Sequence, residues 1–135
     1  MPAIHHIDNN NKLIITTWNG EPTASDLVDA FRNYQRDIKS KPEFIDYDEI
    51  VDFSGIEGFK LSADGLRMMG SIAANTDNPG KKSKLAIVVK STLAFGLARM
   101  YEIYRSFNPQ SNKAIRVFKY KSEALAWIAK QNNQA

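Results

Sequence analysis

The apolar and polar residues follow two different spacings along the chain, and the change of spacing predicts strands separated by helices. Residues 4–7 form a short candidate strand, and residues 13–18, which are rich in β-branched side chains, form a second one. Between them, residues 8–11 read Asp-Asn-Asn-Asn, a sequence typical of turns. We therefore expect a hairpin with a four-residue turn, whose second strand ends at Asn19-Gly20.

The first helix is predicted to begin at Thr23, because Asp26 three residues later completes the pattern of a capping box. It should end at Lys41, since the residue before a proline disfavours helical backbone. One face of this helix is apolar at helical spacing and should point into the core. That face consists of Leu27, Phe31, Tyr34 and Ile38.

The rest of the chain continues the alternation of strands and helices. Strands are predicted at residues 47–53, 85–89 and 115–118. Helices are predicted from Ser62, from Thr92 to about Phe107, and from Ser122 to Ile128, with Ser62 and Ser122 as caps. The run at 85–89 is apolar at every position, which is typical of a central parallel strand covered by helices on both faces.

The resulting order of elements is ββαβαβαβα. Strands that are separated by helices pair in parallel through crossovers, so the chain is expected to form an α/β sandwich. Its sheet should be mixed but mostly parallel, with one antiparallel edge strand. Because 135 residues suit one domain, residues 1–135 are predicted to form a single domain with a polar tail at about 131–135.

Composition narrows the class of protein. The apolar runs, such as residues 85–89, are far shorter than the roughly 20 residues of a membrane helix, and the chain does not begin like a signal peptide. We therefore expect a soluble, cytoplasmic protein without a membrane span. There is no cysteine, which excludes disulfides, thiolate metal ligands and cysteine nucleophiles.

Charge is distributed unevenly. Residues 1–64 carry 12 acidic and 6 basic side chains, a net of −6, whereas residues 65–135 carry 3 and 12, a net of +9. This asymmetry favours a surface that binds an anion or a partner, although folding could equally mix the two halves into an ordinary salt-bridged surface. The overall net charge of +3 and the lack of an RNA-type aromatic motif argue against nucleic-acid binding.

No group of residues forms a recognisable catalytic site. The only histidines, His5 and His6, are adjacent on a predicted strand, so they point to opposite faces and cannot readily share a metal ion. Asp46, Asp48 and Asp52 alternate along one strand, as on the polar side of an exposed strand. Residues 78–83 lack the spacing of a phosphate-binding loop. We expect no catalytic residue, no metal, no cofactor and no enzymatic activity.

The most distinctive stretch is residues 51–56, Val-Asp-Phe-Ser-Gly-Ile, followed by residues 62–66, Ser-Ala-Asp-Gly-Leu. It resembles the pattern of STAS domains, in which a strand ending in Asp-Leu-Ser-Gly leads to Asp-Ser-Ser-Gly-Leu at the start of a helix. Residues 95–101, 116–118 and 124–128 look like the uncharacterised SpoIIAA-like group. The resemblance implies a STAS/SpoIIAA-like fold, and that group is sometimes compared with CRAL-TRIO lipid-binding domains.

In the anti-sigma-factor antagonists that this fold resembles, a partner kinase phosphorylates a serine of the helix-start motif and thereby blocks partner binding. Here Ser62 falls on the aspartate of that motif, while Ala63 and Asp64 fall on its two serines, so the phosphoacceptor is missing in this register. Ser62 suits a helix cap, and Asp64 suits the positive end of the helix dipole. A functional alternative is that Asp64 permanently replaces a phosphoserine. Ser54 follows a predicted strand end, where α/β sheets usually place ligands.

The third helix offers two further candidate surfaces. Its apolar arc, with Tyr101 and Ile103 at the edges, is predicted to be core, and consists of Leu93, Leu97, Met100, Tyr104 and Phe107. On the opposite, solvent-facing side, Phe95 shares a face with Arg99 and Glu102, with Arg105 near Glu102. An aromatic side chain beside an arginine is typical of interface hot spots, so these residues are candidates for a dimer contact or the mouth of a ligand site.

A hydrophobic ligand pocket is the competing interpretation of the same region. Its lining would be Met68, Met69, Met100, Tyr101, Tyr104 and Phe107, with an acidic head group received by Lys81, Lys82, Lys84, Arg99 and Arg105. Ordinary core packing and solvated lysines explain these residues too. The sequence thus predicts a non-enzymatic binding module with a protein partner or a homodimer contact. The alternative is a carrier or sensor of a small hydrophobic or amphipathic acid.

Overall fold

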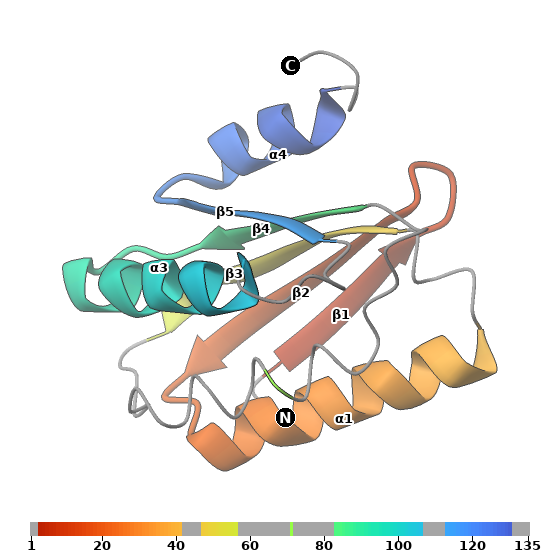
Figure 1. Cartoon of the computed structure of the whole chain (residues 1–135), viewed down its shortest axis with the longest axis horizontal. Coiled ribbons are helices and arrows are strands. Elements are labelled where there is room, and N and C mark those ends of the chain that lie inside the picture. The colour runs from red at the N-terminus through yellow and green to blue at the C-terminus, as the bar shows by residue number, and fades with distance from the viewer. Residues whose placement is uncertain (1–2, 42–46, 57–70, 72–82, 107–112, 131–135) are drawn as a thin grey trace.

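The computed structural model describes residues 3–41, 47–56, 71, 83–106 and 113–130. Its five strands form one sheet in the order β1-β2-β3-β4-β5, in which β1 is antiparallel to β2 and the later strands are parallel (Figure 1). The elements are β1 (Ala3–Asp8), β2 (Leu13–Gly20), α1 (Ala24–Ser40), β3 (Asp48–Ile56), β4 (Ser83–Val88), α3 (Thr92–Ser106), β5 (Lys113–Phe118) and α4 (Lys121–Ala129). The predicted α/β architecture with an antiparallel edge strand is confirmed. The predicted helix from Ser62 lies outside the described residues.

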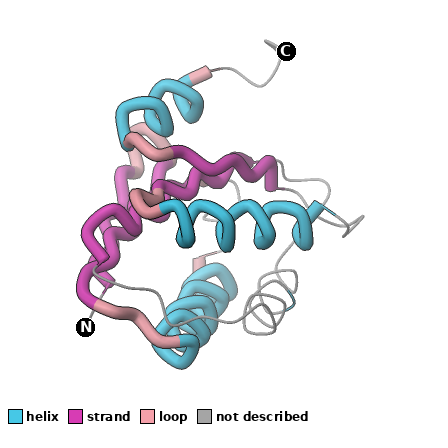
Figure 2. Tube along the Cα trace, turned by 90° about the vertical axis from the view of Figure 1, so that its left-hand side faces the viewer, coloured by secondary structure: helices cyan, strands magenta, loops and turns pink. Residues whose placement is uncertain are grey.

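Two layers of helices enclose the sheet. Helices α1 and α3 lie on one face and α4 lies on the other (Figures 1 and 2). Right-handed crossovers between successive neighbouring strands place their helices on the same face, whereas α4 follows the last strand and joins no further one. The sheet therefore has two cores of unequal size.

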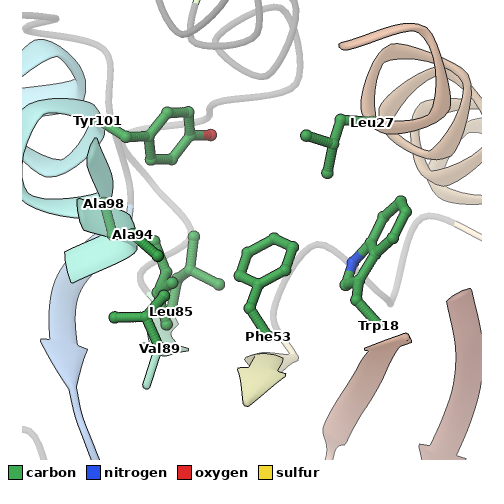
Figure 3. Close-up of a cluster of buried hydrophobic side chains, with 9 residues drawn as sticks. Trp18, Leu27, Phe53, Leu85, Val89, Ala94, Ala98 and Tyr101 are labelled. Carbon is green, nitrogen blue, oxygen red and sulfur yellow. The ribbon is translucent and has the colours of Figure 1, made fainter. Parts of the chain in front are cut away.

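The larger core fills the space between the sheet and the α1–α3 layer (Figure 3). Trp18 and Phe53 stack there with ring centroids 5.8 Å apart, and Leu27 of α1 packs against the same cluster. The smaller core lies on the α4 side, where Ala124 sits on strand residues. Those residues are Leu13, Ile50, Ala86 and Val88.

Local hydrogen bonds explain where the early elements begin and end. Asp8 closes the predicted four-residue turn, because its carboxylate accepts bonds from the backbone N–H groups of Asn10 and Asn11 and from the side chain of Asn11. These bonds, above all the one from the Asn11 side chain, lower the pKa of the Asp8 carboxyl below its usual value of 3.8. The stability that the ionised carboxylate adds to the fold is therefore lost as the pH falls from 3.8 through the lower pKa of the folded state. The capping box is also confirmed, since Thr23 N donates to Asp26 Oδ2 at 2.9 Å and Asp26 N donates to Thr23 Oγ1 at 3.1 Å.

The predicted cap of the last helix is wrong. Helix α4 begins at Lys121, so Ser122 lies inside its first turn, and Tyr120 occupies the cap position without a side-chain cap bond. The backbone N–H groups of Glu123 and Ala124 donate instead to the carbonyl oxygen of Tyr120. The first turn is thus closed by backbone alone, and we expect α4 to depend on tertiary contacts for its stability.

Candidate functional site

The connections that leave β4 and β5 diverge at the carboxyl end of the sheet. The chain after β4 enters α3 on one face, and the chain after β5 enters α4 on the other (Figures 1 and 2). Val89 N donates to Phe118 O at 2.9 Å, and this bond holds the ends of β4 and β5 together just before their connections separate. Diverging connections at the carboxyl ends of neighbouring strands are where open α/β sheets usually bind ligands.

We call this region the carboxyl rim and define it by Lys90, Ser91, Phe95, Lys119 and Tyr120. Ser91 caps the start of α3, because its hydroxyl accepts a bond from Ala94 N at 3.0 Å. Lys119 Nζ lies 5.6 Å from the centre of the Phe95 ring, within the range of a cation–π contact. Tyr120 is 66% exposed, more than the other exposed large apolar or aromatic residues of the described chain. The rim therefore presents aromatic and basic groups side by side.

Of the interface candidates of α3, Phe95 belongs to this rim, and Arg99 and Glu102 follow it on the same helix. Arg99 Nη1 donates to both carboxylate oxygens of Glu102 at 3.1 Å, so the two side chains form one ion pair on the helix surface. Phe95 was predicted to face solvent, and this prediction is wrong. Its side chain is half-buried and packs against the larger core, with Lys119 over its ring. This side of α3 thus carries an aromatic side chain, Phe95, between the larger core and Lys119, and an ion pair between Arg99 and Glu102.

The pocket candidates are placed differently from the prediction. Tyr101, expected at the edge of the apolar arc, is central to the buried face of α3, which consists of Ala94, Ala98, Tyr101 and Arg105. Its ring points into the larger core (Figure 3). Met100 is half-buried and packs against the same core. Met68, Met69, Phe107 and the side chain of Tyr104 lie outside the described residues, so the described part of the chain does not assemble the predicted pocket.

Two cations predicted to receive an acidic head group are buried. Arg105 is 5% exposed, and its Nη1 donates to the Tyr101 hydroxyl at 3.0 Å. Lys84 is 7% exposed, and its Nζ donates to the carbonyl oxygens of Trp127, at 3.0 Å, and of Lys130 at the end of α4. Lys84 is at the start of β4 and Arg105 is in the last turn of α3, whereas the carboxyl rim lies where β4 ends and α3 begins. Lys81 and Lys82 lie outside the described residues.

The motif that suggested the STAS resemblance forms a bulge. Strand β3 continues to Ile56, so Ser54 lies within the strand rather than after it. The pairing shifts between Thr17 and Asn19 of β2, which pair with Asp52 and Gly55 of β3, so one extra residue of β3 is accommodated there. Asp52 was predicted on an exposed polar side, but it is buried, and its Oδ1 accepts a bond from Ser54 N at 2.9 Å.

The glycine of this motif lies close to β2. A Cβ atom on Gly55 would lie 2.9 Å from Asn19 Oδ1 and 3.3 Å from the Trp18 carbonyl oxygen. The aspartate and the glycine therefore have structural roles in the bulge. Ser62 and Asp64, the other regulatory candidates, lie outside the described residues, so the phosphoserine-replacement hypothesis stays a prediction.

Replacing Asp52 by alanine is expected to lower the free energy of unfolding by about 1–3 kcal/mol, because the part-buried N–H of Ser54 loses its charged acceptor. Asp52→Asn keeps an acceptor oxygen at the same position and should cost clearly less. Urea unfolding followed by circular dichroism measures both variants. Equal losses in the two variants would show that the bond to Ser54 is not what the carboxylate contributes.

The described residues contain no group of potential metal ligands. In this part of the chain no three His, Cys, Asp or Glu side chains are grouped closely enough to hold a metal ion. His5 and His6 alternate across β1, and His5 Nδ1 lies 2.9 Å from Thr16 Oγ1 on the neighbouring strand. None of the described helices has the length and hydropathy needed to cross a membrane.

Comparison with known proteins identifies the architecture. No family model matches the chain, and no curated protein matches it. Among solved structures, the chain is similar to an uncharacterised protein of the DUF3478 family from Shewanella loihica PV-4, which has a SpoIIAA-like fold. The match has a TM-score of 0.55 and 15% sequence identity, and it covers 94% of this chain and 92% of the other. The chain therefore has a SpoIIAA-like fold.

Proposed function

We propose that this domain is a non-enzymatic binding module whose carboxyl rim binds a partner protein. The observation that supports this most directly is the exposed Tyr120 beside the Lys119–Phe95 contact. Tyrosine buries a large amphipathic surface at low entropic cost, and it is enriched among the residues that dominate binding energy. The Arg99–Glu102 ion pair on the adjoining flank would add a polar border to such a surface.

The arrangement of side chains favours protein binding over chemistry. The rim brings together aromatic, hydroxyl and ammonium groups, but its defining residues include no carboxylate or imidazole that could act as a general base. The two lysines of the rim that flank the aromatic residues give it a positive character, which favours a partner surface with acidic residues.

The proposal is tested by capturing partners on immobilised protein from a lysate of the source organism and quantifying them by mass spectrometry. Tyr120→Ala should reduce the recovery of the specific partner by about 10- to 30-fold, the effect of losing a central interface side chain. Leu125→Ala is the matched control, because Leu125 is also an exposed side chain but belongs to α4 beyond the rim. Unchanged recovery with Tyr120→Ala, or equal losses with both variants, would contradict the proposal.

A carrier of a small hydrophobic acid is the second candidate. It is favoured by the buried Arg105–Tyr101 pair, which places a cation and a hydroxyl at the border of the larger core. Native mass spectrometry of freshly purified protein separates the two functions. A binding module should show the mass of the chain alone, whereas a carrier should show an additional mass that is released as a free acid on denaturation.

A further inference from the structure

Strand β1 forms the edge of the sheet, and its outer side is open in the described part of the chain. The strand pairs only with β2 there, so its outward backbone N–H and C=O groups have no described strand beside them. Edge strands of natural proteins are usually protected from pairing by lysine, proline or a bulge. The six residues of β1 read Ala-Ile-His-His-Ile-Asp, and their pairing with β2 runs without a shift from Ala3 to Asp8.

The two isoleucines of β1 are exposed on opposite faces of the sheet. Ala3 pairs with Trp18 of the larger core and therefore lies on the α1–α3 side of the sheet. Alternate residues of a strand share a face, so Ile7, four residues after Ala3, lies on that side too. Ile4 lies on the α4 side. Ile4 is 63% and Ile7 is 42% exposed, and they are two of the five exposed large apolar or aromatic residues of the described chain. A helix docked on one face could cover only one of them, whereas a strand added at the edge would flank both.

The opposite edge of the sheet is protected. Strand β5 carries Arg116, whose guanidinium lies 5.6 Å from the centre of the Phe118 ring and 5.7 Å from that of Trp127. Helices α3 and α4 both pack on β5, one on each face. The two edges therefore differ. An added strand would meet the charged Arg116 in the middle of β5, whereas the one acidic residue of β1, Asp8, is its last residue.

We propose that β1 pairs with β1 of a second copy of this chain, joining two five-stranded sheets into one sheet of ten strands. The occupant is a second copy because an antiparallel edge is self-complementary about a twofold axis normal to the sheet. An axis through His5 pairs Ala3 with Ile7 and Ile4 with His6 of the other copy, so each isoleucine gains a cross-strand neighbour on its own face. An axis through His6 would instead place Ile4 opposite the carboxylate of Asp8.

This proposal is independent of the carboxyl rim, and it predicts association that depends on concentration. A strand-to-strand contact buries little surface and gives a weak complex, so sedimentation velocity should be followed up to about 1 mM protein. Ile4→Lys and Ile7→Lys, which place a charge on either face of the edge, should each abolish the dimer. Ile103→Lys is the matched control, because Ile103 is an exposed isoleucine of α3 and its replacement should leave the dimer intact.

The absence of cysteine allows the contact to be located directly. Residues opposite each other in an antiparallel pair have Cα atoms about 4.5–5.5 Å apart, which suits a disulfide. Under mild oxidation, His5→Cys should cross-link about tenfold faster or more than Ile103→Cys and also faster than His6→Cys. Fastest cross-linking at position 6 would overturn the assigned register. A protein that stays monomeric to 1 mM, or a dimer that survives both lysine variants on β1, would overturn the proposal itself.

Discussion

Replacing Trp18 by alanine is expected to lower the free energy of unfolding by about 3–5 kcal/mol. The side chain is 2% exposed, stacks on Phe53 and belongs to the cluster that includes Leu27 of α1, so its removal leaves a cavity between the sheet and a helix (Figure 3). A domain of this size is stabilised by roughly 5–15 kcal/mol, so the loss is a large share of the total. Urea unfolding followed by circular dichroism measures it without relying on tryptophan fluorescence.

The other tryptophan provides the control. Trp127 is half-buried in the smaller core and contacts Phe118 with ring centroids 5.8 Å apart. Because less of its surface is buried, Trp127→Ala should cost about 1–2 kcal/mol. A Trp18→Ala variant that loses no more stability than Trp127→Ala would show that the described larger core is not the main source of stability.

The second large effect is expected at Lys84. Replacing it by methionine should lower the free energy of unfolding by about 2–3 kcal/mol, because two carbonyl oxygens at the end of α4 lose a charged donor. Methionine keeps the apolar stem that packs beside Trp127, so the variant isolates the ammonium group. The loss should be local, and hydrogen exchange should accelerate in α4 more than in the sheet.

An exposed lysine provides the comparison for this variant. Lys90 lies at the surface of the carboxyl rim, and Lys90→Met should change stability by no more than about 0.5 kcal/mol. If Lys84→Met leaves exchange in α4 unchanged, the carbonyl bonds do not hold the helix. The apolar contacts of Ala124, Trp127 and Ile128 would then be sufficient by themselves.

The architecture could be predicted from the sequence because its strands and the cap of α1 rest on local patterns. The hairpin depends on Asp8 and its neighbours, and the start of α1 depends on the reciprocal bonds of Thr23 and Asp26. The cap of α4 was misplaced because Ser122 has the right residue type, but the helix begins one residue earlier through backbone bonds to Tyr120. Residue type alone does not fix which residue occupies the cap.

The side chains of α3 show why the candidate site was less predictable. An apolar arc was expected to face inward, but the helix approaches the sheet through the small residues Ala94 and Ala98, and Tyr101 follows them into the core. This rotation buries Arg105 and brings Phe95 beneath Lys119 of a distant connection. Contacts between residues far apart in the sequence decided both outcomes, and periodicity cannot report such contacts.

Among the five described strands, the neighbours of each strand in the sheet are also its neighbours in the order of strands along the chain. During synthesis, each emerging strand from β2 onward can therefore add to an edge that already exists, and none has to insert between two paired strands. The β1–β2 hairpin, whose strands are close in sequence, can form first, and closure of the short loop costs little entropy. The molecule can thus be assembled progressively from its amino-terminal hairpin to α4 as the chain leaves the ribosome.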